Sequence, residues 1–272
     1  MSERKVEPPG KTRPSGGRDK GPSDKGPSEK VGKRGRLAAW AKRLDGEGAS
    51  ERRLLDLFLT SPVFVAYHLG VVFLKVRNGM DPITDTMLSV LHRSLAAYLG
   101  ITVLVGAALF AAMRFTRTGG KLKPLVFLGR VAESAVYAIL MAIVARTVVA
   151  HAALGPKAGP HLDPFSAFIM SMGAGFYEEL AFRVLLFGGG LFIIKKLGSS
   201  SGASLGLGIA WAFVAAACFS GIHYVGSMSD DFAFSSFVFR LVCGLFLTLV
   251  YRLRGFATAV WTHALYDVWV MI

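Results

Sequence analysis

The sequence has little cysteine and little charge for a chain of 272 residues. Its two cysteines, Cys218 and Cys243, lie inside apolar stretches without metal-ligand spacing, so we expect no disulfide framework. Charged residues make up 18% of the chain and hydrophobic residues 53%, which is too apolar for an ordinary soluble domain. Residues 1–30 contain no apolar run typical of a cleavable signal peptide. The composition predicts a polytopic membrane protein whose first hydrophobic helix directs insertion.

Acidic residues are scarce, and the formal net charge is +13. Residues 1–53 hold 15 Lys and Arg against 8 Asp and Glu, and much of the remaining excess lies in short connections between apolar runs. No motif that reads RNA or DNA accompanies these basic residues. We therefore interpret them as the cytoplasmic side of a membrane protein, and we expect the lipid bilayer as a partner and no nucleic acid.

The amino-terminal part of the chain differs in composition from the rest. Residues 1–35 are rich in Pro, Gly, Ser, Lys and Asp, so they cannot bury enough apolar area to offset the entropy lost on ordering. We predict a disordered, basic cytoplasmic tail. Residues 36–53 carry Leu37, Trp40 and Leu44 among basic residues, a pattern typical of a short amphipathic helix on an anionic membrane surface.

Apolar runs of about the length of a membrane-spanning helix follow this tail. They predict an all-α fold, a polytopic transmembrane helical bundle of about seven spans behind the tail. We divide the chain into the tail at 1–53, three transmembrane helices at 54–150 and a core of four transmembrane helices at 165–272. The runs lie at 54–76, 94–113, 126–150, 165–194, 204–225, 233–252 and 255–272.

The charges of the connecting loops predict the orientation in the membrane. Lys and Arg are concentrated after the second, fourth and sixth runs, which alternation places on the same side as the basic tail. The loop at 227–231 contains neither, and the first loop, with Lys75, Arg77 and Arg93, is the exception. A bacterial inner membrane fits this arrangement, with the amino terminus in the cytoplasm and the carboxyl terminus outside.

Two carboxylates and a guanidinium lie within the fourth apolar run, at Glu178, Glu179 and Arg183. An ionisable group at bilayer depth is costly unless it is paired or faces a water-filled cavity, so these groups are functional candidates. Glu179 and Arg183 are four residues apart and share a helix face, so we expect them to pair. Glu178 points about a quarter-turn away, and we expect its carboxylate to remain available.

Further polar groups lie on later apolar runs. His223 ends the fifth run, and His263 and Asp267 are four residues apart on one face of the seventh. Polar groups on separate spans must be satisfied without water, which favours their meeting at one site.

Such a cluster supports hydrolysis. A carboxylate in a low-dielectric cavity is a stronger base for activating water, and imidazoles stabilise the oxyanion that forms on an attacked carbonyl. Zinc or another divalent metal is an alternative, because Glu178, His223 and His263 match the two-His, one-carboxylate ligand set of catalytic zinc. There is no H-E-x-x-H motif, and no Ser or Cys nucleophile stands out.

The order of these motifs on separate apolar runs resembles the CPBP family of intramembrane proteases. That family includes CAAX prenyl endopeptidases of the Ras-converting type and bacteriocin-processing and immunity proteins. The resemblance covers residues 165–272, which would form the catalytic core, and the earlier runs match nothing. The motifs are E-E-x-x-x-R at Glu178, Glu179 and Arg183, F-x-x-x-H at Phe219 and His223, and H-x-x-x-N/D at His263 and Asp267.

The resemblance implies a role for each residue of the first two motifs. Glu178 would activate the hydrolytic water, with His223 helping to orient it. Glu179 and Arg183 would shape and support the site.

The resemblance also implies that His263 and Asp267 polarise the scissile carbonyl and stabilise the oxyanion. Asp267 stands where Asn is common in the family, and Asp donates a hydrogen bond only when it is protonated. Members of the family are described both as metalloproteases and as glutamate-dependent enzymes, and the sequence leaves both mechanisms open.

We therefore predict an intramembrane protease, glutamate-type or metal-dependent, that cleaves a membrane-associated protein or peptide. A non-catalytic membrane scaffold or immunity factor and a proton-coupled transporter are alternatives that would use the same intramembrane charges. Arg146 and Arg240, in the third and sixth runs, are interpreted as structural residues that pair or snorkel.

Overall fold

The computed structural model describes most of the chain beyond the predicted tail. Residues 1–35 lie outside the described part, and so does the predicted amphipathic helix except for residues 49–53, which begin the first described helix. The described residues are 49–74, 81–92, 94–115, 124–151, 163–197, 201–225 and 229–272.

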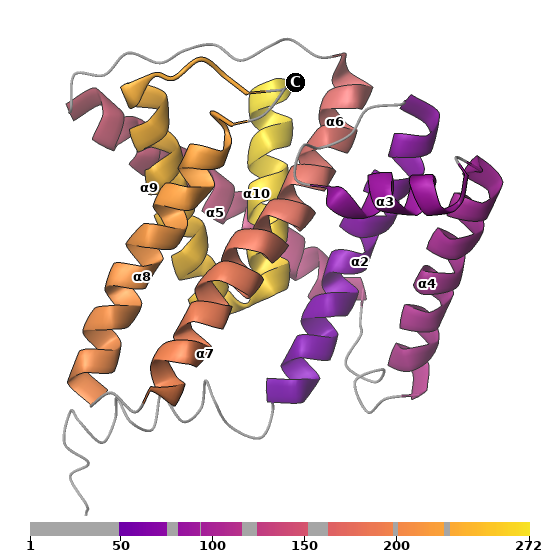
Figure 1. Cartoon of the computed structure of the whole chain (residues 1–272), viewed down its shortest axis with the longest axis horizontal. Helices are drawn as coiled ribbons and strands as arrows, with labels where there is room; N and C mark the ends of the chain where they lie inside the picture. The colour runs from indigo at the N-terminus through magenta and orange to yellow at the C-terminus, as the bar shows by residue number, and fades with distance from the viewer. Residues whose placement is uncertain are drawn as a thin grey trace, which may run out of the picture. The chain divides into compact units, whose positions relative to one another are not determined.

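Within these ranges the chain is helical and contains no strand, which confirms the predicted all-α fold (Figure 1). Helices α6 and α7 are joined without a break by two π-helical segments, η2 (Ala174–Glu178) and η3 (Leu180–Gly188). The α-helices are α2 (Ala49–Leu74), α3 (Pro82–Val90), α4 (Leu95–Phe115), α5 (Pro124–His151), α6 (Pro164–Gly173), α7 (Gly189–Lys196), α8 (Ser201–Ile222), α9 (Phe234–Arg254) and α10 (Phe256–Met271).

Each of the seven predicted apolar runs is helical, but a count of about seven spans is not confirmed. In the described part of the chain, four helices are long and apolar enough to cross a membrane, and α4 carries a shorter apolar stretch, Leu95–Ala108. Helix α10 has 16 residues, fewer than the about 20 that a straight crossing needs. The four stretches are Asp56–Leu74, Pro124–Ala150, Gly202–Ile222 and Phe234–Arg254.

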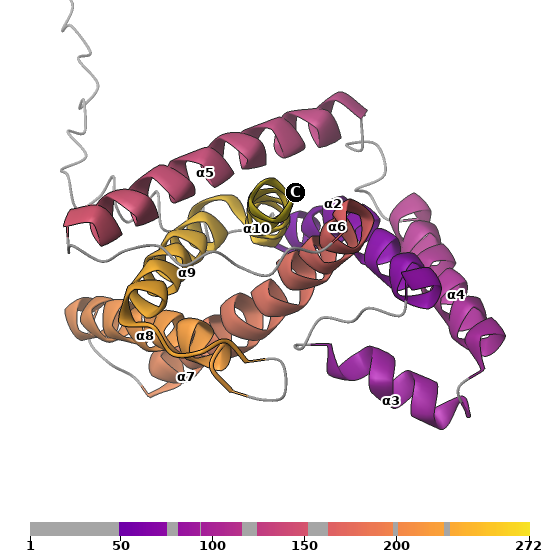
Figure 2. The same cartoon turned by 90° about the horizontal axis from the view of Figure 1, so that it is seen from above.

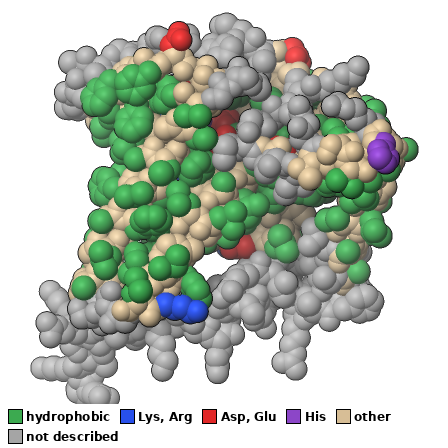
Figure 3. Space-filling model, viewed as in Figure 1, with side chains coloured by type: hydrophobic (Ala, Val, Ile, Leu, Met, Phe, Trp, Pro, Cys, Tyr) green, Lys and Arg blue, Asp and Glu red, His purple; other side chains and the backbone are tan. Residues whose placement is uncertain are grey.

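Large apolar side chains cover the outer faces of the helices. Leu128 and Ile143 on α5 and Leu205 and Phe213 on α8 are each more than half exposed. Figure 3 shows hydrophobic side chains spread over α8 and α9, with Lys or Arg at the edge where α7 ends. An apolar outer surface of this extent is that of an integral membrane protein.

Short polar motifs fix where α3 and α6 begin. Asp81 accepts a hydrogen bond from the backbone N–H of Thr84, Asp163 accepts one from Ser166, and proline follows each Asp at the first helical position. Hydrogen bonds from Ser166 hold the pKa of the exposed Asp163 carboxyl below its usual range. Helix α3 lies in the predicted first loop, and Asp81-Pro82 is the signal that could have predicted its start.

Helix α10 lies in the middle of the described helices, in contact with α2, α5, α6, α9 and η2 (Figure 2). Its start is fixed by Gly255, whose φ of 94° favours glycine, and by Asp56 of α2, whose carboxylate accepts a hydrogen bond from the N–H of Phe256 at 3.0 Å. The central position brings residues of α10 close to η2 and η3.

The contact between η2 and α10 depends on Gly175. A Cβ atom at this position would lie 2.7 Å from the Ala264 Cβ and 2.8 Å from the backbone oxygen of Val260. Because one of these neighbours is backbone, it cannot move aside without displacing α10. The backbones of η2 and α10 are thus in direct contact beside Glu178.

We expect the substitution Gly175→Ala to lower the free energy of unfolding by about 1–3 kcal/mol, because the added methyl group overpacks this contact. The measurement is thermal unfolding in detergent, followed by tryptophan fluorescence. Gly189→Ala on the same helical stretch is the matched control, because a Cβ there meets nothing within 4 Å and alanine favours a helix over glycine. Equal unfolding temperatures for the two variants would contradict the prediction.

Candidate functional site

The predicted pair of Glu179 and Arg183 is present and buried. Arg183 Nε lies 3.1 Å from Glu179 Oε2, and the two side chains are 1% and 0% exposed. The guanidinium also lies 4.2 Å from the centre of the Phe219 ring on α8, and its Nη2 donates to the Gly244 carbonyl of α9 at 3.4 Å. Arg183 therefore joins the π-helical stretch to the two neighbouring helices.

The second oxygen of Glu179 reaches α10. Its Oε1 is 2.8 Å from Nδ1 of His263, so it accepts the Nδ1–H hydrogen bond of that imidazole. A hydrogen bond to one ring nitrogen fixes the orientation of a histidine and leaves the other nitrogen for the site. Glu179 thus holds Arg183, as predicted, and also His263, a contact that the sequence motifs did not reveal.

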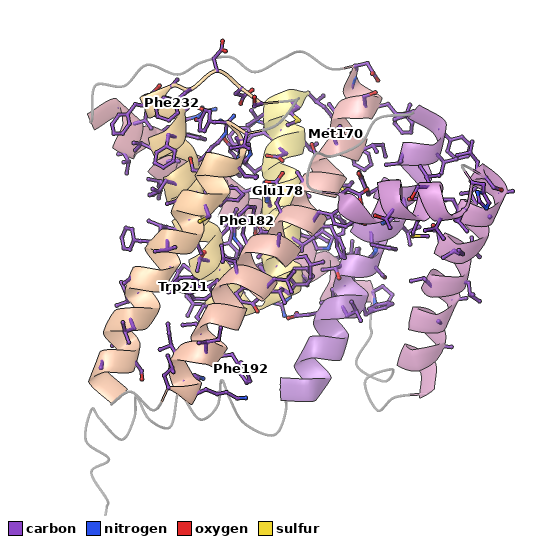
Figure 4. The ribbon with its side chains drawn as sticks, in the orientation of Figure 1. Met170, Glu178, Phe182, Phe192, Trp211 and Phe232 are labelled. Carbon is purple, nitrogen blue, oxygen red and sulfur yellow. The ribbon has the colours of Figure 1, made fainter. Side chains whose placement is uncertain are left out.

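Glu178, labelled in Figure 4, lies close to two histidines, His223 just after α8 and His263 on α10. Its Oε2 is 3.9 Å from Nε2 of His223 on the carboxyl-terminal side of α8 and 4.0 Å from Nε2 of His263. Both distances are longer than a direct hydrogen bond and allow one bridging water. The His223 side chain is 27% exposed and that of Glu178 only 8%, so Glu178 is the more buried of the two.

The ring of His223 is also fixed. Its Nδ1 lies 2.9 Å from the Phe219 carbonyl, which accepts the Nδ1–H and leaves Nε2 toward Glu178. The Phe219 ring packs edge-on against His223, His263 and Phe182 at centroid distances of 5.5, 5.7 and 5.4 Å. Phe219, noted in the sequence only as a motif position, is the apolar residue against which both imidazoles are placed.

Asp267 lies on the face of α10 that the spacing predicted. Its Oδ2 is 3.5 Å from Nε2 of His263, and its side chain is 14% exposed. The same imidazole nitrogen therefore lies near two carboxylates, those of Glu178 and Asp267.

The structure brings all six predicted site residues together. They come from the π-helical stretch, from the end of α8 and from α10. Ser220, next to this group in sequence, donates its hydroxyl to the Phe237 carbonyl at 2.7 Å and points toward α9 instead. The arrangement offers a buried carboxylate, two oriented imidazoles and no neighbouring hydroxyl nucleophile among these residues.

The predicted zinc ligand set is not supported by the geometry. Across the described residues, no group of three His, Cys, Asp or Glu side chains is arranged to hold a metal ion. The two Nε2 atoms lie 4.0 and 3.9 Å from Glu178 Oε2. In this arrangement the predicted ligands do not form a metal site.

Arg146 and Arg240 have structural partners. The Arg146 guanidinium lies 5.8 Å from the centre of the Trp269 ring, and Arg240 forms an ion pair with Asp230 and donates to the Tyr224 hydroxyl at 3.1 Å. Each therefore has a neighbour of the kind that the structural interpretation expects.

A family comparison matches the part of the chain that contains the site. Residues 160–269 match the family described as type II CAAX prenyl endopeptidase Rce1-like. No curated protein and no solved structure matches the chain. The matched range contains all six predicted site residues and confirms the resemblance identified from the motifs. Residues 160–269 therefore belong to the type II CAAX prenyl endopeptidase Rce1-like family, and the apolar helices together with this match identify the chain as an integral membrane protein.

Proposed function

We propose that this protein is an intramembrane endopeptidase of the glutamate type that hydrolyses a peptide bond in a membrane-associated protein or peptide. The observation that carries the proposal is the placement of Glu178 Oε2 within 4.0 Å of Nε2 of both His223 and His263. One carboxylate facing two oriented imidazoles provides a base and two groups that position the reactants.

The hydrolytic water would lie between Glu178 and His223. A separation of 3.9 Å is bridged by one water hydrogen-bonded to both groups. Glu178 takes a proton from this water, and the water oxygen attacks the carbonyl carbon. The C–N bond then breaks as Glu178 returns the proton to the leaving amine. The reaction consumes one water, and its products are a carboxylate and an amine.

The oxyanion would form on the side of His263 and Asp267. Because Glu179 holds the Nδ1–H, a doubly protonated His263 presents its second N–H from Nε2 to the carbonyl oxygen. A protonated Asp267 beside it supplies a further donor.

This role makes Asp267 an informative position. Asp267→Asn is expected to keep or raise the cleavage rate, since the amide donates a hydrogen bond without needing a proton, whereas Asp267→Ala should lower kcat about a hundredfold. Initial rates on one substrate with both variants check this. A loss of activity in Asp267→Asn as large as in Asp267→Ala would show that the carboxylate is needed as an anion.

We propose that the amino terminus is cytoplasmic and the carboxyl terminus outside, with residues 1–53 as the tail, 54–150 as amino-terminal helices and 165–272 as the catalytic core. In support, the amino-terminal ends of α2 and α8 and the carboxyl-terminal end of α7 lie at the lower edge of Figure 1. The amino-terminal end of α6 and the carboxyl-terminal end of α10 lie at the upper edge. Reporter fusions after residue 229 test this orientation, and a cytoplasmic signal there would reverse it.

The function is tested with purified protein in liposomes. Proteins that accumulate uncut in cells lacking this protein are incubated with wild type, Glu178→Gln or His263→Ala, each with and without a chelator. Cleavage by wild type alone, unaffected by the chelator, supports a glutamate-type protease, and loss of cleavage with the chelator would assign a metal-dependent one. Equal processing by all three proteins would leave the scaffold or transporter alternatives.

A further inference from the structure

A second buried polar cluster lies outside the proposed catalytic residues, on α2, α3, α4 and η2. We call it the Tyr–His cluster. Its side chains sit among apolar residues, and each residue is at most 6% exposed. Its members are Tyr67, His68, Asp81, Thr84, Tyr98 and Tyr177.

His68 is the central residue of the Tyr–His cluster. Its Nε2 is 2.8 Å from the hydroxyl of Tyr177, and its Nδ1 is hydrogen-bonded to the hydroxyl of Tyr98. A neutral imidazole has one donor and one acceptor nitrogen, and each tyrosine hydroxyl both donates and accepts, so this pair of bonds satisfies both nitrogens. His68 therefore links α4 to η2 through α2.

The rest of the cluster fixes α2 and α4 to α3. Tyr98 and Thr84 hydroxyls lie 3.2 Å apart, and Tyr67 donates to Asp81 at 2.8 Å. Asp81 also caps α3 through the N–H of Thr84 at 2.9 Å. Fully satisfied buried networks of this kind are rigid, because every unpaired group would be costly.

The cluster ends one residue before Glu178. Tyr177 is the neighbour of Glu178 in η2, and the Tyr67 ring packs against the backbone at Gly173, where a Cβ would lie 2.4 Å from it. On its other side, η2 contacts α10 at Gly175. The segment that carries Glu178 is thus held between α2 and α10, and π-helical turns such as this one often mark functional sites.

We infer that His68 is a positioning residue for Glu178: by bonding the Tyr177 hydroxyl, it fixes the rotation of η2 and so the direction of the Glu178 carboxylate. This inference rests on the proposed function. His68 touches no reacting atom in this scheme and acts through Tyr177. A misplacement of a catalytic group by about 1 Å can cost a hundredfold in rate, so such support is measurable.

Two substitutions of His68 separate its two bonds. The amide of His68→Gln reaches the position of Nε2 and keeps the bond to Tyr177, whereas the amide of His68→Asn reaches only the position of Nδ1 and keeps the bond to Tyr98. We expect His68→Asn and Tyr177→Phe to lower kcat about tenfold or more with KM nearly unchanged, and His68→Gln to stay within about threefold of wild type. The double variant His68→Asn/Tyr177→Phe should lose little beyond either single one.

Amide hydrogen exchange supplies a readout that does not need activity. Peptides that cover residues 174–188 should exchange faster in His68→Asn and Tyr177→Phe than in wild type and His68→Gln. Wild-type kcat in His68→Asn, or equal exchange in all variants, would overturn the inference, as would equal losses of kcat in the Gln and Asn variants. If cleavage survives in Glu178→Gln, the proposed function fails instead, and the exchange data alone decide whether His68 holds η2.

Discussion

Replacing Glu178 by Gln is expected to lower kcat for peptide-bond cleavage about a thousandfold and to leave KM nearly unchanged. Glutamine has the shape of glutamate but cannot take a proton from water. The carboxylate is buried, and its Oε2 faces Nε2 of His223 and His263 at 3.9 and 4.0 Å. With the base removed, the oriented imidazoles still hold water and substrate, so the loss should appear in the chemical step.

The comparison needs a variant with the same change of charge away from the site. Asp231→Asn serves for this, because Asp231 is exposed in the segment before α9. Single-turnover cleavage in liposomes and thermal unfolding should be measured for both variants beside wild type. We expect Asp231→Asn to match wild type in rate and Glu178→Gln to match it only in unfolding. If Glu178→Gln kept more than about a tenth of the wild-type kcat, Glu178 would not be the base.

A second comparison concerns the length of the side chain. Glu178→Asp keeps the carboxylate but withdraws it by one methylene group from the two imidazoles. Since proton transfer needs a heavy-atom distance of about 2.6–3.2 Å to the bridging water, we expect a rate between those of wild type and Glu178→Gln.

Helical spacing alone predicted part of the site. Residues four apart share a helix face, and this rule paired Glu179 with Arg183 and His263 with Asp267, as the structure confirms. The argument that buried charges on separate helices must meet brought His223 to the same place. These predictions needed only the period of a helix and the cost of an unpaired charge in a membrane.

The contacts between helices could not be predicted in the same way. The hydrogen bond of Glu179 to His263 depends on which faces of η2 and α10 meet, and the close approach at Gly175 determines this. The π-helical turns also rotate the side chains after Ala174 relative to an ideal α-helix. Neither feature leaves a periodic pattern in an apolar run.

No motif spacing marks the Tyr–His cluster in the sequence, because its members lie on separate helices. His68 lies in the apolar run 54–76, and a histidine there was a signal of the same kind as His223. Its partners Tyr98 and Tyr177 are amphipathic residues that occur both as packing and as hydrogen-bonding groups, so their pairing became apparent only in three dimensions. The number of spans is not confirmed for a related reason, since apolar runs predict helices but not whether each one crosses the membrane.

Removing the guanidinium of Arg183 is expected to destabilise the protein strongly. Arg183→Met keeps most of the volume of the side chain but leaves the Glu179 carboxylate, which is 0% exposed, without its ion-pair partner. Breaking a buried ion pair by removing one member costs about 3–5 kcal/mol, because the remaining charge is not solvated. Glu179 would keep only its contact with His263. Thermal unfolding in one detergent, followed by tryptophan fluorescence, measures the loss.

A more exposed arginine–carboxylate pair serves as the control. Arg240 pairs with Asp230, whose side chain is 46% exposed, so Arg240→Met should cost no more than about 1 kcal/mol. The double variant Glu179→Gln/Arg183→Met removes both buried charges and should be more stable than Arg183→Met alone, since no unpaired carboxylate remains. If Arg183→Met and Arg240→Met unfolded at the same temperature, the buried pair would not be a main source of stability, and the role of Arg183 would then be to orient Glu179 and, through it, His263.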